Sequence, residues 1–457
     1  MLRRNISDHV REALLDRPVV LVNGARQTGK TTLVQSLVAA GHQATYVSLD
    51  EAPAHAAAYT DPAGFLSRFE GPVILDEIQR APELFLAIKV QVDRARIPGR
   101  FLLTGSSDIL LLPRLADALP GRMEILTLWP LSQGEIEGVR EGLIDVLFSD
   151  HMPALPRGRA VGAELWERLV RGGLPEAQAL VEPRRREAWF GSYLTTILQR
   201  DVRDVSNVAG LTELPRLLAL LAARGGTLLN AAEVSSSSGL PWNTLRRYMA
   251  LLQGAFLVQT VPAWSGGQGV RLLKRPKLLV VDSGLMAFLL GVGAERLAVD
   301  QGPLGGLLEN FVIMELWKQA TWSRTRPAFS HFRTSGQQEV DLVLEDRRGR
   351  VVGVEVKRSA TVGPGDFQGL RALATAAGAR FWRGVVLYGG EMALPFGGRF
   401  HAVPIEAVWR TGAPTEPGRA GEAAPEEPYR LQAPRAKRPR QVSRAGGRGR
   451  PRAGSGA

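Results

Sequence analysis

The residues most indicative of chemistry form a glycine-containing loop near the start of the chain. They match the phosphate-binding pattern G-x-x-x-x-G-K-[ST] and read Gly24-Ala25-Arg26-Gln27-Thr28-Gly29-Lys30-Thr31. In a loop of this kind, backbone N–H groups surround the phosphates, the lysine reaches the β- and γ-phosphates, and the last hydroxyl contacts Mg²⁺. We therefore expect residues 24–31 and the adjacent Thr32 to bind a nucleoside triphosphate, with Thr31 as a magnesium ligand. The alternative is an ordinary glycine turn before a helix.

Two carboxylates end a later apolar segment, Pro72-Val73-Ile74-Leu75-Asp76-Glu77. From the end of such a strand, Asp76 would hold the Mg²⁺ shell. Glu77 would orient and deprotonate the attacking water. GTPases often lack this glutamate, so its presence favours an ATPase that uses ATP and Mg²⁺. A solvated Asp–Glu pair that closes a strand is the alternative.

A third apolar segment, Arg100 to Ser107, ends in small hydroxyl residues. Because ligands bind at the carboxyl ends of the strands in an open α/β sheet, Thr104 or Ser106 is expected to sense the γ-phosphate or position the water. The same residues are equally typical of a turn. Arg122 is a candidate cation for the charge of the transition state, and a structural ion pair is the alternative for it.

The elements that must position these residues belong to an α/β fold. The segment from Pro18 to Asn23 is apolar and is predicted to be a buried strand. The segment from Thr31 to Ala40 is predicted to be a helix, with Leu33, Leu37 and Val38 on one face, and Gly41 can end it. A strand, loop and helix in this order direct a helix N-terminus at the phosphates.

Several motifs together resemble a prokaryotic family of AAA+-type ATPases that carry an extra C-terminal domain of unknown function. The resemblance covers the chain except its tail and is specific for the family, not for a biological role. The motifs that carry it are Gly24 to Thr31, Leu75-Asp76-Glu77-Ile78-Gln79, Leu103-Thr104-Gly105-Ser106-Ser107, Leu128-Trp129-Pro130-Leu131-Ser132, Gly172-Gly173-Leu174-Pro175-Glu176, Gln199-Arg200-Asp201-Val202, Val281-Asp282-Ser283-Gly284-Leu285 and Glu355-Val356-Lys357.

A second set of chemical residues lies near the C-terminus, on two predicted strands, Gln338 to Glu345 and Arg350 to Lys357, that form a hairpin. Glu355 and Lys357 are two residues apart and share one face, and Asp341 is expected to meet Glu355 across the hairpin. An ordinary hairpin with a salt bridge is the alternative.

This Asp, then Glu-x-Lys, arrangement resembles PD-(D/E)xK nucleases, although Val340 replaces the usual proline. The resemblance implies that Asp341 and Glu355 bind Mg²⁺ while Lys357 stabilises charge or activates water. Glu309, on a predicted helix, would add a third carboxylate, and Gln368 on the next helix would assist. A domain of this fold can also keep its carboxylates and serve only in binding.

The middle of the chain is predicted to be helical and to include a winged helix-turn-helix, at about residues 229–264. Its candidate recognition helix begins after Pro241 and offers groups suited to phosphates and base edges, Asn243, Thr244, Arg246 and Arg247. A winged helix used only for packing is the alternative. Arg200 or Arg203, on an earlier helix, is a candidate arginine finger, and an exposed helix with paired charges is the alternative.

Composition limits the classes of protein. The 457 residues contain no cysteine, which excludes disulfides, thiol catalysis and cysteine-bound zinc. No secretory signal and no apolar run long enough to span a membrane are present, so we expect a cytoplasmic protein. The net charge is +12. From Thr411 onward, ten Arg or Lys stand against four Glu, so a disordered basic tail is predicted, which would bind nucleic acid or only solubilise the chain.

These observations predict four regions. They are a P-loop ATPase domain (1–142), a helical region with the winged helix (143–290), a nuclease-like α/β domain (304–409) and the tail (411–457). The predicted function is ATP binding and hydrolysis, with action on DNA through the winged helix and the nuclease-like domain. The alternative is an ATP-dependent switch or DNA-binding regulator whose nuclease-like domain is inert. A small-molecule NTPase is a third hypothesis, and a homo-oligomer is possible for AAA+-type relatives.

Overall fold

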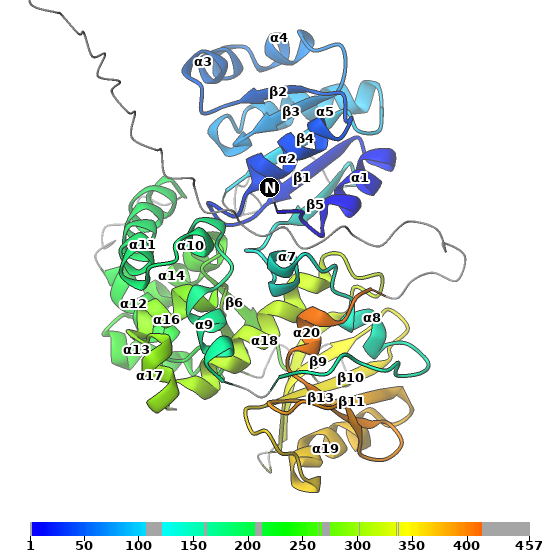
Figure 1. The fold of residues 1–457 in the computed structure, drawn as a ribbon. Helices are drawn as coiled ribbons and strands as arrows, with labels where there is room; N and C mark the ends of the chain where they lie inside the picture. Colours follow the sequence, from blue (N-terminus) through cyan, green and yellow to red (C-terminus); the bar gives the residue numbers. More distant parts are fainter. Residues whose placement is uncertain are drawn as a thin grey trace, which may run out of the picture. The chain divides into compact units, whose positions relative to one another are not determined.

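The computed structural model describes residues 2–106, 121–159, 162–205, 213–264, 266, 275–300, 302–334, 336 and 338–413, with the backbone alone for 199–205. Contacts gather Met1–Thr415 into one compact unit, drawn in Figure 1. Ser107, the side chains of Arg200 and Arg203, and nearly all of the predicted tail lie outside the described residues.

The N-terminal part is built on a sheet of five parallel strands. In this sheet β1 (Val19–Asn23) lies between β4 (Phe101–Gly105) and β5 (Met123–Thr127), and β3 (Val73–Asp76) lies between β4 and β2 (Thr45–Ser48). The strands β1, β3 and β4 are buried at every position, as expected of a parallel sheet covered on both faces. The three strands predicted from apolar runs are therefore confirmed. The strands β2 and β5 were not predicted, because both are partly exposed and mix polar with apolar residues.

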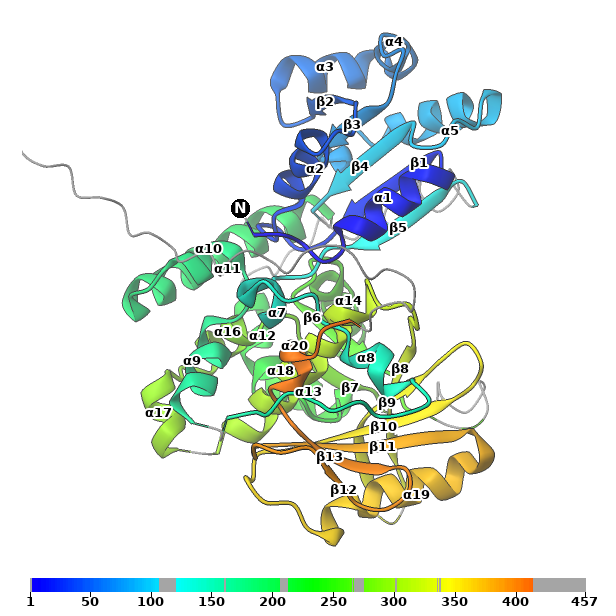
Figure 2. The same ribbon diagram turned by 45° about the vertical axis from the view of Figure 1, so that its right-hand side comes forward.

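Helices cover both faces of this sheet, since alternate residues of each strand point to opposite sides. Val20, Val22 and Leu102 pack with α1 (Ser7–Asp16) and α2 (Lys30–Ala39). The other face carries three helices, best seen in Figure 2: α3 (Ala52–Thr60), α4 (Pro62–Ser67) and α5 (Leu84–Arg94). The predicted helix after the glycine loop is confirmed as α2.

The middle region is mainly helical, as predicted. It also contains a short antiparallel pair, β6 (Val258–Val261) with β7 (Lys277–Val280), of which only β6 was expected. The helices are α7 (Gln133–Glu137), α8 (Leu143–Leu147), α9 (Ala163–Arg171), α10 (Pro175–Ala179), α11 (Pro183–Val205), α12 (Leu214–Ala222), α13 (Ala231–Ser238), α14 (Trp242–Gly254), α16 (Ser283–Leu290) and α17 (Ala294–Val299).

The C-terminal region is a mixed six-stranded sheet in the order β12-β13-β11-β10-β9-β8. The predicted hairpin is confirmed, because its two strands pair in antiparallel register. Val351 lies opposite Glu345, and Val354 lies opposite Leu342. The strands are β8 (Ala328–Arg333), β9 (Glu339–Glu345), β10 (Val351–Lys357), β11 (Phe381–Tyr388), β12 (Leu394–Pro395) and β13 (Phe400–Pro404), with helices α18 (Leu304–Ala320), α19 (Gln368–Ala377) and α20 (Ala407–Arg410).

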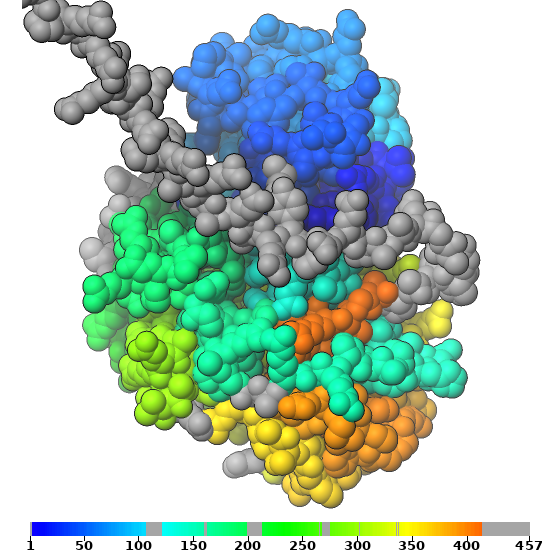
Figure 3. Space-filling model, viewed as in Figure 1, coloured from blue at the N-terminus to red at the C-terminus, as the bar shows by residue number. Residues whose placement is uncertain are grey.

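One continuous hydrophobic cluster joins the middle region to the C-terminal sheet, from Trp166 and Leu218 through Phe311 to Val354 and Trp409. The last described segment packs back on the body. Its helix α20, drawn in orange against teal in Figure 3, contacts α7, α8 and α18. The predicted limits 1–142, 143–290 and 304–409 thus divide a body with shared cores, and they stay predictions.

The helix α18 is central to this body. Its buried polar side chains form hydrogen bonds with the segment that follows β5. Glu315, which is 0% exposed, accepts a hydrogen bond from the Gln133 N–H at 2.8 Å. Lys318 donates to Glu315 at 2.6 Å and to the Leu131 carbonyl at 3.0 Å. Among the described helices, none is long and apolar enough to cross a membrane.

Candidate nucleotide site and a second carboxylate cluster

The loop between β1 and α2 has the backbone conformation that its glycines require. Gly24 has φ 146° and Gly29 has φ 91°, and Gln27 adopts the left-handed φ of 62°. A Cβ on Gly24 would lie 2.2 Å from the carbonyl oxygen of Leu128, so no larger residue fits there. The loop therefore brings its backbone close to the start of α2, the geometry of an anion-binding loop.

Side chains of the loop hold it closed on itself. The Lys30 ammonium donates to the carbonyl oxygens of Gly24 at 3.0 Å and Ala25 at 2.8 Å, and the Thr28 hydroxyl donates to Ala25 at 2.9 Å. From the middle region, the Tyr193 hydroxyl on α11 donates to the Arg26 carbonyl at 3.2 Å. Buried residues alternate in the loop with others that are at least partly exposed: Arg26, Gln27, Gly29, Thr31 and Thr32.

Asp76, at the carboxyl end of β3, is the centre of a set of hydroxyl donors. Its Oδ2 accepts hydrogen bonds from Thr31 at 2.9 Å and Tyr46 at 2.7 Å, and its Oδ1 accepts from Thr104. Burial, and then the hydrogen bond to Asp76, raise the pKa of Tyr46 far above its usual value. The P-loop threonine and the acidic strand end, 45 residues apart, thus meet directly.

Glu77 follows with a left-handed backbone, φ 60° and ψ 48°, which is uncommon for a residue with a side chain. Its N–H donates to the Thr104 hydroxyl at 3.1 Å. The Gln79 amide donates to the Glu77 carboxylate and, at 2.9 Å, to the Ser106 hydroxyl. Gln79 therefore fixes the predicted base beside one of the predicted hydroxyl residues.

These residues fit a magnesium nucleotide. A hydroxyl and a carboxylate, Thr31 and Asp76, supply the oxygen ligands that Mg²⁺ prefers, and the glycine loop is too tight for side chains at Gly24. The Oδ1 atom of Asn23, buried at the end of β1, has no hydrogen-bond partner among the described residues. A polar group unsatisfied at this position is typical of a functional site.

Arg122 does not join this site, which corrects its prediction as the cation of its own chain's transition state. Met123 pairs with Val19, the first residue of β1, so Arg122 lies at the amino edge of the sheet. The glycine loop leaves the opposite, carboxyl edge. Arg122 instead donates to Asp93 at 2.6 Å, which is the structural ion pair weighed as the alternative.

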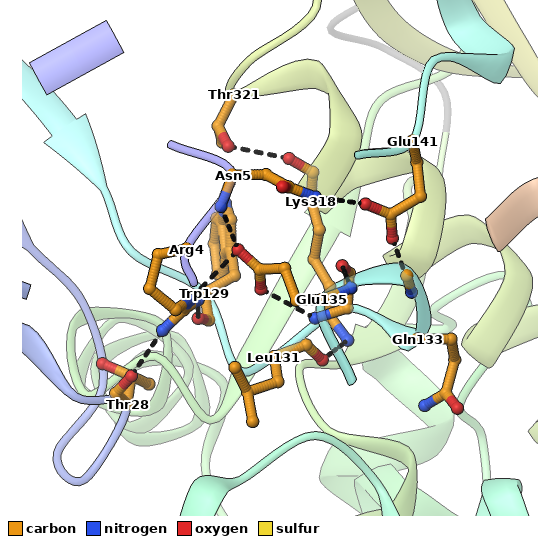
Figure 4. Close-up of polar contacts among 12 residues, drawn as sticks. Arg4, Asn5, Thr28, Trp129, Leu131, Gln133, Glu135, Glu141, Lys318 and Thr321 are labelled. Carbon is orange, nitrogen blue, oxygen red and sulfur yellow. Dashed lines mark hydrogen bonds and ion pairs between the residues drawn. The ribbon is translucent and has the colours of Figure 1, made fainter. Parts of the chain in front are cut away.

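The N-terminal segment contributes a residue that motif analysis missed. Figure 4 shows the Arg4 guanidinium bridging three elements. It donates to the Thr28 carbonyl of the glycine loop at 2.7 Å, to the Trp129 carbonyl at 2.7 Å, and to the Glu135 carboxylate at 3.1 Å. Arg4 therefore ties the backbone of the glycine loop to the segment between β5 and α7.

Behind Arg4 lies a buried group of carboxylates, also shown in Figure 4. Glu135 accepts from the Asn5 N–H at 2.7 Å, and Glu141 accepts from the Asn5 amide at 2.5 Å and from the Gly134 N–H at 2.8 Å. Burial raises the pKa of Glu141 to about 8. The indole N–H of Trp322, just beyond α18, donates to the Glu141 carbonyl at 3.0 Å. A polar chain thus runs from the glycine loop to the end of α18.

The predicted nuclease-like residues come together in part. Asp341 on β9 accepts from the Val356 N–H on β10 at 2.9 Å, and Lys357 donates to Glu355 at 2.8 Å. The Oε2 atom of Glu355 is buried without a partner among the described residues. Burial, and then the neighbouring Asp341, raise the pKa of Glu355 to about 7. Gln368 begins α19.

An unpredicted lysine occupies the middle of this cluster. Lys277 on β7, 1% exposed, donates to Glu309 and lies 3.3 Å from Asp341 and 3.7 Å from Glu339. Burial opposes its charge, but Asp341 and Glu309 raise its pKa above the usual range. Burial and Asp341 raise the pKa of Glu309 to about 8.

The predicted metal site at Glu309, Asp341 and Glu355 has to be corrected, because Lys277 lies among these carboxylates. Among the described residues, no group of three or more His, Asp or Glu side chains is arranged to hold a metal ion. The residues as placed do not fit Mg²⁺, because the Lys277 ammonium already lies against carboxylate oxygens of Glu309 and Asp341. Lys277 escaped sequence analysis since it lies 32 residues before Glu309, on a strand that no periodicity marked.

The predicted nucleic-acid residues lie on α14. Leu245, Tyr248, Leu251 and Leu252 face the core. Asn243, Arg246 and Arg247 are exposed, Thr244 is half-buried, and Trp242 is 51% exposed. The helix thus presents polar and basic groups and one aromatic ring on its outer face.

Family models match most of the chain. Residues 16–137 match a family described as "AAA domain", residues 162–296 a "Domain of unknown function (DUF8612)", and residues 304–408 a "Domain of unknown function (DUF4143)". The N-terminal part is accordingly an AAA-type ATPase domain.

Two mycobacterial relatives match over nearly the whole chain. The uncharacterized proteins Rv2008c of Mycobacterium tuberculosis and Mb2031c of Mycobacterium bovis are each 32% identical over 416 residues, which covers 91% of this chain and 86% of theirs.

Among solved structures, a Walker-type ATPase of Pyrococcus abyssi matches with TM-score 0.40 and 12% identity, over 63% of this chain and 96% of that one. The RuvB Holliday junction branch migration motor of Thermotoga maritima matches with TM-score 0.28 and 22% identity, over 56% and 89%. Nothing about function follows from likenesses this distant.

Arg4→Gln is expected to weaken ATP binding about tenfold, because it removes charged hydrogen bonds that fix the Thr28 carbonyl. Arg4→Lys should recover part of the affinity. The control is Arg3→Gln, whose side chain is 73% exposed and pairs with Asp8. Titration with a fluorescent ATP analogue measures the effect, and wild-type affinity in Arg4→Gln would contradict the assignment.

Proposed function

We propose that this chain, which belongs to the same family as the two mycobacterial relatives, binds ATP with Mg²⁺ and hydrolyses it. One observation carries the proposal: the Thr31 hydroxyl of the glycine loop bonds Asp76 at 2.9 Å, at the carboxyl edge of a parallel sheet. This edge is where open α/β sheets bind ligands. The match of residues 16–137 to the AAA domain supports the same conclusion.

The residues have distinct roles in this proposal. Residues 24–32 would surround the phosphates, Lys30 would leave the loop carbonyls for phosphate oxygens, and Thr31 with Asp76 would hold Mg²⁺. Bound Mg²⁺ would neutralise charge on the phosphates. Glu77 would accept the proton of the attacking water, while Gln79, which also donates to Ser106, holds its carboxylate in place.

Lys30→Ala is expected to abolish ATP binding, whereas Glu77→Gln should bind ATP normally and hydrolyse it about a hundredfold more slowly, as for loss of a general base. Phosphate release and nucleotide titration measure the two effects. The matched controls are Lys89→Ala and Glu70→Gln, on the same domain and away from the loop. Wild-type turnover in Glu77→Gln would refute the role of this carboxylate.

We propose further that the chain acts on DNA through α14. The helix exposes Asn243, Arg246 and Arg247 while its apolar face is buried, and Trp242 offers a ring on which a base can stack. The order α13, α14, β6, β7, with Gly239 at φ 72° in the turn, supports a winged helix-turn-helix.

The double variant Arg246→Gln/Arg247→Gln is expected to bind duplex DNA about tenfold more weakly and to lower the salt slope by roughly two, because each Arg–phosphate contact releases counterions. Fluorescence anisotropy at several salt concentrations measures both quantities. The control is Arg184→Gln/Arg185→Gln, an exposed pair on α11. Equal losses in both double variants would show that net charge alone, not α14, determines binding.

For the C-terminal domain we favour the inert alternative: an ATP-dependent switch or DNA-binding regulator with a nuclease-like binding module. The position of Lys277 among the carboxylates supports it. Wild-type protein is expected to leave linear, supercoiled and branched DNA uncut with Mg²⁺ or Mn²⁺, with and without ATP. Metal-dependent cleavage that disappears in Asp341→Ala would instead establish a nuclease.

A further inference from the structure

Lys277 is fixed by two regions of the chain at once. Its strand pairs with β6, where Val261 is its direct partner. Asn310 on α18 accepts from the Val280 N–H at 2.7 Å and donates to the Val280 carbonyl at 2.8 Å. Glu309 is the neighbour of Asn310 in α18. The hydrogen bonds of Asn310 therefore fix β7, which carries Lys277, next to the carboxylate of Glu309.

The carboxylates around the ammonium group come from α18 and β9. Glu309 contacts it directly, Asp341 lies 3.3 Å away and Glu339 lies 3.7 Å away. The second oxygen of Asp341 accepts from the Val356 N–H. Both oxygens of Asp341 therefore have partners, and the lysine supplies one of them.

A divalent cation would have to compete with this ammonium group for the same carboxylate oxygens. Mg²⁺ binds oxygen at about 2.0–2.1 Å with near-ideal octahedral geometry, and a like charge buried beside it is strongly repelled. We propose that Lys277 is a built-in cation that closes the nuclease-like carboxylate cluster to divalent metal while β7 remains paired, an autoinhibitory contact between the middle region and the C-terminal domain.

The contact is connected to α14 through a short pair of strands. The β6–β7 ladder has four residue pairs and directly follows α14, the helix proposed to meet DNA. Movement of β7 would withdraw Lys277 from Glu309 and Asp341. This last step rests on the proposed function of α14, whereas the exclusion of metal by Lys277 does not.

The experiment measures Mn²⁺ binding to the full chain by calorimetry and electron paramagnetic resonance. Lys277→Gln is expected to bind Mn²⁺ at least about tenfold more tightly than wild type, a change comparable to that of other residues next to metal ligands. The gain should disappear in Lys277→Gln/Asp341→Asn. Arg371→Gln is the matched control, since this exposed cation of the same domain donates to the Pro364 carbonyl at 2.8 Å, and it should bind Mn²⁺ like wild type.

Three results would overturn the inference: no gain in folded Lys277→Gln, an equal gain in Arg371→Gln, or a gain that survives Asp341→Asn. If Lys277→Gln does not fold by circular dichroism, amine labelling of the wild-type chain replaces it. Lys277 should resist labelling with and without excess Mn²⁺. Labelling that Mn²⁺ induces would show that metal displaces the lysine unaided. None of these results depends on ATP turnover.

Discussion

Compensation of buried charge is the constraint on which the arrangement of this chain depends. A carboxylate removed from water must be matched by a cation or by hydrogen-bond donors. Glu135 has Arg4, Glu315 has Lys318, and Glu309 with Asp341 has Lys277. Lys277 comes from the middle region and its carboxylates from the C-terminal domain, so this pair also joins two regions of the chain.

The consequence for function is a physical connection between the nucleotide site and the rest of the molecule. The Arg4 guanidinium donates hydrogen bonds to the Thr28 carbonyl of the glycine loop and to the Glu135 carboxylate. The helix that carries Glu135 is tied to α18 at its first residue, because the Gln133 N–H donates to Glu315. The same helix carries Glu309 in the second cluster. A change in the loop on binding ATP therefore has a continuous route of packed polar groups toward the C-terminal domain.

The sequence predicted what is local and missed what is tertiary. The strand before the loop, α2, β3, β4 and the C-terminal hairpin follow from periodicity and turn residues within short windows. Tyr46 and Arg4 belong to no motif, and Gln79 lies in a motif that gave it no role. Their roles become recognisable only when the chain brings them to Asp76, Thr28 and Glu77. Of the two alternatives for Arg122, the structure shows the ion pair, and spacing along the chain does not reveal which edge of a sheet a residue occupies. Lys277 shows that a carboxylate pattern alone does not specify a metal.

Arg4 connects the glycine loop to the carboxylates behind it, so nucleotide binding in the loop should be felt at these carboxylates. Hydrogen–deuterium exchange with and without a non-hydrolysable ATP analogue and Mg²⁺ tests this most directly. We expect slower exchange in residues 24–32 together with residues 4–6, 131–141 and the end of α18, and loss of the distant protection in Arg4→Gln under saturating nucleotide. Protection confined to residues 24–32 in the wild-type chain would contradict it.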